Sequence, residues 1–232
     1  MSGRGKMVDG IGVVIPAYNE AGRIEAVLDA VLNSTSVNQV VVVDDGSEDG
    51  TYEVVAEYVK SGGVMLVRLP SNRGKAMAAW VGVQCIKQPI IVMLDADLIG
   101  LSPEHVEMLA EPIRLGVADM TIGVFQRGRW ATDWSHRIAP NISGQRGLRK
   151  ELFLKLPSPN GLGYGLEAFL NCWAKRCGWR VKHVVLEGVS HVTKEEKLGI
   201  VRALIARSRM YWEIGRALLD SFMTNGGDEW GD

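Results

Sequence analysis

Four short apolar runs in the first 100 residues alternate with segments of helical periodicity. The runs are rich in Val and Ile and predict buried strands; they cover Gly12–Ile15, Val40–Val43, Val64–Leu69 and Ile90–Leu94. Between the runs, apolar residues recur every three or four positions, which predicts helices. The clearest set is Ile24, Val27, Leu28, Val31 and Leu32. Continuous apolar strands that alternate with amphipathic helices predict an α/β fold, with a mostly parallel central sheet covered by helices on both faces.

The rest of the chain is less regular, and its elements are predicted with fewer repeats of the pattern. Helices are expected over Pro103–Leu115, Arg146–Leu156 and Gly165–Cys177, and strands over Met120–Phe125 and Arg180–Leu186. The stretch from residue 126 to residue 144 has no period, which is typical of a long binding loop. A long C-terminal amphipathic helix is expected over residues 195–224, because an apolar stripe runs along it.

Composition fits a globular protein and excludes several other classes. The 232 residues are 47% hydrophobic and 23% charged, which suits a single domain over residues 1–232. The formal net charge of -1 gives no global field that would attract nucleic acid. No run approaches the roughly 20 apolar residues of a membrane span, and Met1–Gly10 lacks the apolar core of a signal peptide. A cytoplasmic protein is therefore expected.

A segment with residues that can bind a ligand follows each predicted parallel strand. The residues of interest are Pro16, Ala17, Tyr18 and Glu20 after the first strand, Asp44 and Asp45 after the second, Gly74 and Lys75 after the third, and Asp95, Ala96 and Asp97 after the fourth. In open α/β sheets, ligands bind outside the carboxyl ends of the strands. We therefore expect all four groups to face one crevice.

The residue types in these groups favour a metal and a diphosphate. Asp95 and Asp97 directly after a buried strand are costly without a compensating charge, and Mg²⁺ or Mn²⁺ supplies one through oxygen ligands. Lys75 follows Gly74 at a predicted helix start, where anions are favoured. Asp44 and Asp45 can accept hydrogen bonds from a base or a ribose. The alternative for each group is structural: a solvated turn, a helix cap or a surface lysine.

Together these segments resemble the successive motifs of family-2-type glycosyltransferases, which have the GT-A (Rossmann-like) fold. The matching segments, in the order of the family, are Val14–Glu20, Val42–Ser47, Asn72–Lys75 and Leu94–Asp97. The resemblance implies that residues 1–100 form the half that binds the nucleotide sugar. In that half, the Pro16–Glu20 loop and Asp44 would hold the nucleoside. Lys75 would lie near the diphosphate, and Asp97 would be the main carboxylate on the metal.

Residues 101–194 would form the half that binds the acceptor. Tyr164 and Glu167 belong to a Gly-Tyr-Gly-Leu-Glu segment, which is similar to one in glucosyl-3-phosphoglycerate synthases and polyprenyl-phosphate sugar synthases. Glu167 would position the sugar or the acceptor, or take the acceptor proton. The structural alternative is a carboxylate in the first turn of a helix, where the helix dipole favours it.

Two further features come from the same resemblance. His191 lies 24 residues after Glu167, a spacing similar to that of a metal-binding His in the retaining phosphoglycerate-type enzymes, and would complete the metal site with Asp97. The loop of Gly144, Gln145 and Arg146 would contact an acceptor phosphate. Val189 stands two residues before His191, where those synthases carry an Arg, so phosphoglycerate itself is not assigned as the acceptor.

The resulting hypothesis is the metal-dependent transfer of a hexose from a UDP- or GDP-linked sugar to a small phosphorylated or anionic acceptor. Retention of configuration is favoured by the resemblance of Glu167 and His191 to the retaining enzymes, and inversion with Glu167 as the general base is the alternative. The alternative is a polyprenyl-phosphate sugar synthase at a membrane surface, on which the basic C-terminal helix would lie. The same helix can instead pack on the domain or in a homodimer. A nucleotidyltransferase and a nucleotide-sugar-binding regulator are the rivals from other classes.

Overall fold

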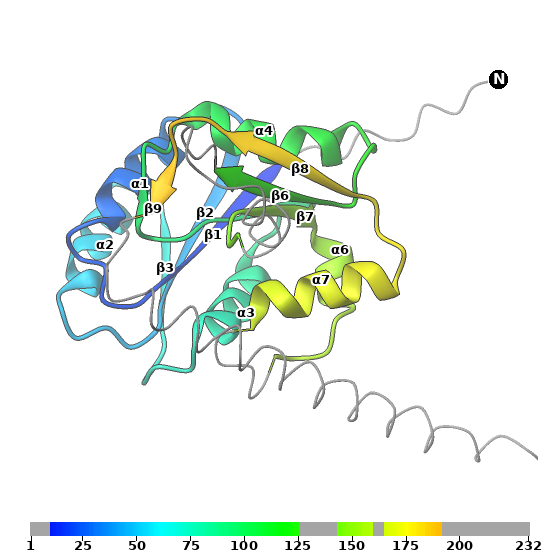
Figure 1. Ribbon diagram of the computed structural model, residues 1–232. Helices are drawn as coiled ribbons and strands as arrows, with labels where there is room; N and C mark the ends of the chain where they lie inside the picture. Colours follow the sequence, from blue (N-terminus) through cyan, green and yellow to red (C-terminus); the bar gives the residue numbers. More distant parts are fainter. Residues whose placement is uncertain (1–9, 126–142, 160–164, 192–232) are drawn as a thin grey trace, which may run out of the picture. The chain divides into compact units, whose positions relative to one another are not determined.

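The computed structural model describes residues 10–125, 143–159 and 165–191, and its elements carry the labels of Figure 1. Its centre is a seven-stranded sheet. Across the sheet the strands lie in the order β3 (Met65–Arg68), β2 (Val37–Asp44), β1 (Ile11–Ala17), β4 (Ile90–Met93), β7 (Arg146–Arg149), β6 (Met120–Phe125) and β8 (Val181–Leu186). The first four are parallel to one another, β6 and β8 are parallel, and β7 runs antiparallel to both of its neighbours.

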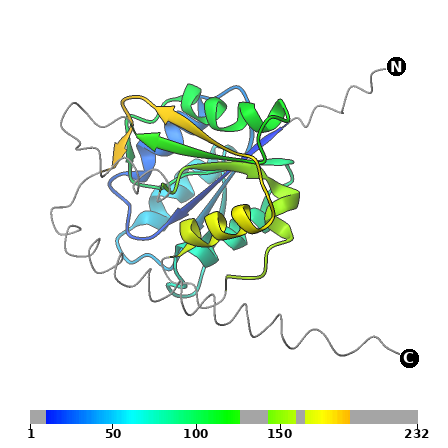
Figure 2. The same cartoon turned by 45° about the vertical axis from the view of Figure 1, so that its right-hand side comes forward.

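Helices cover both faces of this sheet (Figures 1 and 2). One face packs against α1 (Ile24–Leu32), α2 (Thr51–Lys60) and α4 (Pro103–Arg114). The other packs against α3 (Lys75–Cys85), α6 (Lys150–Leu154) and α7 (Leu166–Arg176). Residues of the central strands alternate between these two apolar clusters, as Val13 and Val14 do, and both are fully buried. The predicted mostly parallel α/β sheet with helices on both faces is confirmed.

Strand β7 corrects one predicted element. The helix expected from Arg146 begins only at Lys150, and the four residues before it form a strand in the middle of the sheet. A Cβ atom at Gly147 would lie 2.5 Å from both the carbonyl oxygen of Leu109 and Oγ1 of Thr121. Glycine is therefore what allows the strand to pass so close beneath α4. This tertiary requirement leaves no periodic pattern in the sequence.

A second, two-stranded sheet pairs β5 (Leu98–Ile99) with β9 (Ser190–His191) in antiparallel orientation. Its register sets Leu98 opposite His191. The backbone of His191 therefore lies beside the segment that carries Asp97, although almost 100 residues separate the two positions in the sequence.

Several predicted features lie outside the described residues. They are most of the loop expected over residues 126–144, Tyr164, the side chain of His191 and the C-terminal helix over residues 195–224. Among the helices that the structure describes, none combines the length and the apolar character that a membrane span requires.

Candidate active site

The candidate site forms at one edge of the large sheet, where the carboxyl ends of β1, β2 and β4 meet the start of β7. Pro16 and Ala17 end β1, and Asp44 ends β2. Because β7 is antiparallel to β4 and sets Arg146 opposite Met93, the residues before β7 lie beside those after β4. An antiparallel strand in this position thus brings the predicted donor and acceptor segments together.

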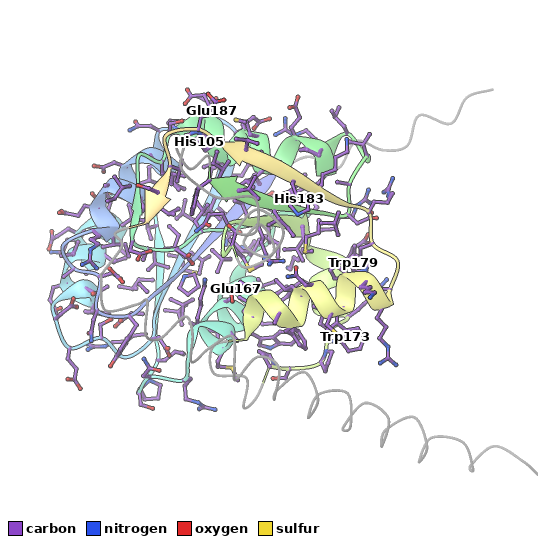
Figure 3. The ribbon with its side chains drawn as sticks, in the orientation of Figure 1. His105, Glu167, Trp173, Trp179, His183 and Glu187 are labelled. Atoms are coloured by element: carbon purple, nitrogen blue, oxygen red, sulfur yellow. The ribbon has the colours of Figure 1, made fainter. Side chains whose placement is uncertain are left out.

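Lys75 lies at the centre of the site, between two carboxylates. Its Nζ is 2.5 Å from Oδ1 of Asp95 and 2.6 Å from Oε1 of Glu167. Lys75 is the first residue of α3, and Glu167 lies in the first turn of α7; Figure 3 shows Glu167 at that helix end, beside α3. The start of a helix is unfavourable for a cation, so the two carboxylates compensate for the position of Lys75.

The electrostatics of this cluster keep Lys75 charged. Burial lowers the pKa of the Lys75 ammonium, but the charges of Asp95 and Glu167 outweigh burial and raise it above its usual range. The side chains of Lys75, Asp95 and Glu167 are 31%, 17% and 16% exposed. Lys75 is therefore a fixed positive charge with partial access to solvent, the kind of group that serves as a point charge for phosphate.

The loop before β7 supports Asp95 from the other side. Nε2 of Gln145 donates to Oδ2 of Asp95 at 2.9 Å, and Oε1 of Gln145 accepts from Oγ of Ser143 at 2.7 Å. A Cβ atom at Gly144 would come within 2.6 Å of both carboxylate oxygens of Asp95 and closer still to Nζ of Lys75. Glycine at this position leaves room for the ion pair.

Arg146 lies behind the two carboxylates, inside the protein, and its residue is only 1% exposed. Its Nε donates to the carbonyl oxygen of Ser143 at 3.0 Å, and Nη1 donates to Oδ1 of Asn171 at 2.7 Å. Burial lowers the pKa of Arg146 to about 10, against the opposing effect of Glu167 and Asp95. The contact of Arg146 with an acceptor phosphate stays a prediction.

The paired aspartates after β2 hold neighbouring backbone in place. Oδ1 of Asp44 accepts from the amide of Ser47 at 3.0 Å, and Oδ2 is 3.2 Å from Nε of Arg68. Asp45 accepts from the amides of Arg73 and Gly74 at 2.7 and 2.8 Å. Burial raises the pKa of Asp45, although these two amide bonds oppose the shift. Asp45 thereby fixes the turn immediately before Lys75.

The segment after β1 is tied to the segment after β2 by hydrogen bonds. Asn19 has a positive φ of 56°, and its amide donates to Oγ of Ser47 at 3.0 Å. The amide of Glu20 donates to Oγ1 of Thr51 at 2.8 Å. Tyr18, in the segment after β1, is exposed. The loops after the first two strands are therefore held against each other, and their contact with a nucleoside stays a prediction.

The two predicted metal ligands, Asp97 and His191, lie on neighbouring segments of backbone. Ala96 is buried and Asp97 is half-buried, one residue before the β5–β9 pairing that includes His191. Among the side chains that the structure describes, which do not include that of His191, no group of three or more His, Cys, Asp or Glu could hold a metal ion. The joint ligation of a metal by Asp97 and His191 stays a prediction.

Two residues of the site were not singled out from the sequence. Arg68 is the last residue of β3 and pairs with Asp44. Its position at the end of a predicted strand could have identified it as a site residue. Asn171 lies four residues after Glu167 on α7 and binds Arg146. Helical spacing alone sets it on the same helix face as Glu167.

Comparisons with known proteins extend this description. The sequence model "Glycosyl transferase family 2" matches residues 12–167. Glucosyl-3-phosphoglycerate synthase from Mycobacterium tuberculosis is 30% identical over 193 residues, which cover 68% of this chain and 58% of that protein. Dolichyl-phosphate beta-glucosyltransferase from Mus musculus is 34% identical over 122 residues, 47% of this chain and 36% of the relative. The chain thus spans about a third to three fifths of the length of these relatives.

Solved structures point in the same direction. The crystal structure of the Mycobacterium tuberculosis synthase in complex with Mn²⁺, UDP-glucose and phosphoglyceric acid has a TM-score of 0.67 and 27% sequence identity. The similarity covers 82% of this chain and 75% of that one. A structure of the same synthase with Mg²⁺ and UDP agrees equally well, at a TM-score of 0.67. The resemblance expected from the motifs is confirmed, and the chain belongs to glycosyl transferase family 2.

Proposed function

We propose that this chain transfers a hexose from a UDP-linked sugar to a small phosphorylated acceptor, in a metal-dependent reaction that retains the configuration of the sugar. The observation that carries the proposal is the position of Lys75 between Asp95 and Glu167, at the sheet edge where the predicted donor and acceptor segments meet. The relative whose structure holds Mn²⁺, UDP-glucose and phosphoglyceric acid supports this choice of donor and of acceptor class.

In this proposal the diphosphate of the donor binds beside Lys75. The ammonium group keeps its proton because Asp95 and Glu167 stabilise the charged form. Asp45 fixes the turn that leads into α3, so the start of that helix would also face the diphosphate. A preorganised cation and helix start stabilise the charge that develops on the leaving group.

The residues near β5 fit a divalent metal. Asp97 supplies carboxylate oxygens, and the backbone of His191 lies opposite Leu98, the next residue after Asp97. Carboxylate and imidazole together suit Mn²⁺, and the diphosphate oxygens would complete the ligand set. When bound, the metal neutralises negative charge on the leaving diphosphate.

The acceptor is proposed by class. Val189 stands where phosphoglycerate-type synthases are expected to carry an Arg, and its side chain is buried in the apolar core. The chain therefore departs from that pattern at this position, and other small phosphorylated acceptors are candidates alongside 3-phosphoglycerate. One carboxylate oxygen of Glu167 would orient the attacking hydroxyl group of the acceptor, while Lys75 holds the other oxygen, Oε1.

The test is the release of UDP from UDP-glucose in the presence of Mn²⁺, with and without a panel of phosphorylated acceptors. We expect acceptor-dependent release that EDTA abolishes. Lys75→Met should lower the rate by about 100-fold or more, the usual effect of losing one group that stabilises the leaving charge. Absence of release from every UDP- and GDP-sugar, with no effect of any of them on the melting temperature, would falsify the proposal. A β-linked first product from an α-linked donor would exclude retention.

A second candidate function is the transfer of a sugar to a polyprenyl phosphate. It is favoured by the relatives themselves, because undecaprenyl-phosphate 4-deoxy-4-formamido-L-arabinose transferase from Aeromonas hydrophila is 32% identical over 138 residues, 57% of this chain and 41% of that protein. Vesicles that contain undecaprenyl phosphate would replace the soluble acceptor in the same assay. UDP release that needs these vesicles, and that no soluble phosphate ester supports, would favour this function.

A further inference from the structure

Both oxygens of Asp95 are engaged, and each by a different element. Lys75 from α3 lies 2.5 Å from Oδ1, and Gln145, just before β7, donates to Oδ2 at 2.9 Å. Gln145 has no exposed surface, so its amide has no water with which to replace this bond. A buried amide that donates to a carboxylate makes one of the stronger hydrogen bonds in a protein.

The orientation of the Gln145 amide is also fixed. The carboxylate of Asp95 can only accept, so Nε2 is the end of the amide that faces it, and the opposite orientation would set an amide oxygen against a carboxylate oxygen. The hydroxyl of Ser143 donates to Oε1 at 2.7 Å and so stabilises the amide in this orientation. The side chain of Gln145 thus opposes rotation of Asp95 away from Lys75.

We propose that Gln145 is a positioning residue for the transfer reaction: through Asp95 it holds the Lys75 ammonium at the place where the donor diphosphate binds. This inference rests on the proposed function. A lysine stem has four flexible carbons, so its ammonium keeps one place only if its partners are themselves fixed. Gly144 contributes by leaving space for the ion pair beside the backbone.

The charges that face Asp95 determine how the arrangement responds to pH. Among the described residues they include Lys75 on α3, Glu167 on α7, which shares Lys75 with Asp95, and Arg146 on β7. In a Gln145→Glu variant, a protonated carboxyl can donate to Asp95 as the amide does. Once ionised, the introduced group repels Asp95 and competes with it for Lys75. The variant should therefore work at low pH and fail as the pH rises.

The experiment measures kcat and KM for UDP-glucose, with Mn²⁺ and 3-phosphoglycerate or the best phosphorylated acceptor, from pH 5.5 to pH 8.5. For Gln145→Glu we expect kcat/KM relative to the unaltered chain to fall about 10-fold or more across this range, the size of one hydrogen bond to a charged group. Gln145→Met should show a similar loss at every pH. The loss should appear in the steps that involve the donor, with the KM for the acceptor unchanged.

Three further variants separate positioning from folding. Ser143→Ala, which leaves the buried Gln145 in place, should lower kcat/KM for the donor, and Ser143→Thr, which keeps the hydroxyl, should restore it. Gln39→Met is the matched control, because Gln39 also uses both ends of its amide, with the carbonyl oxygen of Cys85 and the amide of Lys87. It should lower stability without changing kcat/KM.

The outcomes distinguish this inference from the proposed function. Turnover by the unaltered chain, with variants at residues 143 and 145 that match it at pH 8.5, would overturn the role of Gln145 and leave the transferase proposal intact. Absence of turnover in the unaltered chain would instead overturn the proposed function itself.

Discussion

The ion pair between Lys75 and Glu167 joins the starts of α3 and α7, and a double-mutant cycle can measure its strength. The changes are Lys75→Met, Glu167→Gln and the two together, which remove the charges and nearly keep the side-chain volumes. The side chains are 31% and 16% exposed, with Nζ and Oε1 2.6 Å apart. Exposed pairs contribute about 0.2–1 kcal/mol, and breaking a fully buried pair costs about 3–5 kcal/mol. This partly buried pair should therefore show a coupling of about 2 kcal/mol.

The assay is urea denaturation of the four proteins at pH 7, followed by far-ultraviolet circular dichroism. The coupling is the sum of the unfolding free energies lost in the two single variants, minus the loss in the double variant, so that a favourable pair gives a positive value. Lys75→Met should be the more destabilising single change, because it leaves Asp95 and Glu167 close together without the cation between them. Glu167→Gln leaves Lys75 its bond to Asp95.

A coupling below about 0.3 kcal/mol would refute the reasoning, since independent sites usually add to within that amount. A parallel cycle with Asp95→Asn serves as the control for the other carboxylate. If that cycle gives about 2 kcal/mol and the Glu167 cycle gives none, Lys75 belongs to the donor segment alone. The link between the two helix starts would then be wrong.

Three further predictions test the sheet, an exposed ion pair and the metal. Gly147→Ala should destabilise the fold by about 1–3 kcal/mol in urea denaturation through overpacking, whereas Gly22→Ala, with no atom within 4 Å of the new Cβ, should change stability by less than about 0.5 kcal/mol. The hydrogen bond from Arg180 lowers the pKa of Asp119 despite some burial, so Asp119 contributes stability above its unfolded pKa of about 3.9 and loses it as the pH falls through the folded value. At pH 7, Asp119→Asn should lower the unfolding free energy by about 1 kcal/mol, a modest amount because Arg180 is 55% exposed. This difference should shrink below pH 4, and a difference that stays constant with pH would contradict the prediction. UDP-glucose with Mn²⁺ at 100 times its Kd should add about 2.7 kcal/mol of stability, and Asp97→Asn should remove most of that gain in a thermal-shift assay; an undiminished gain would exclude Asp97 as the metal ligand.

Local patterns in the sequence were sufficient for most of the fold. Val40–Val43 and Ile90–Leu94 are apolar without interruption because both faces of their strands are covered by helices. These local patterns did not predict strand β7. Its sequence, Arg-Gly-Leu-Arg, has no alternation of apolar and polar residues, and its place between β4 and β6 depends on the close approach of Gly147 to α4.

The sequence predicted most residues of the candidate site, but not the contacts between them. The strand-end rule predicted that Lys75 and Asp95 would share one edge. No local rule could pair Lys75 with Glu167, because 92 residues separate them. Likewise, Gln145 was expected to contact the acceptor through the family resemblance. The structure bonds it to Asp95, a partner that depends on the antiparallel register of β7, and its contact with an acceptor stays a prediction.

That register has a consequence for how the chain can reach its folded state. The parallel strands β1 to β4 are complete by residue 93, but β4 lacks its second neighbour until residues 146–149 have been synthesised. Until then the apolar residues 90–93 form an exposed edge of the kind that recruits other chains. A fragment that stops near residue 100 should aggregate rather than fold into a free-standing nucleotide-binding module. A library of truncations should therefore yield soluble protein only when the chain extends beyond residue 149.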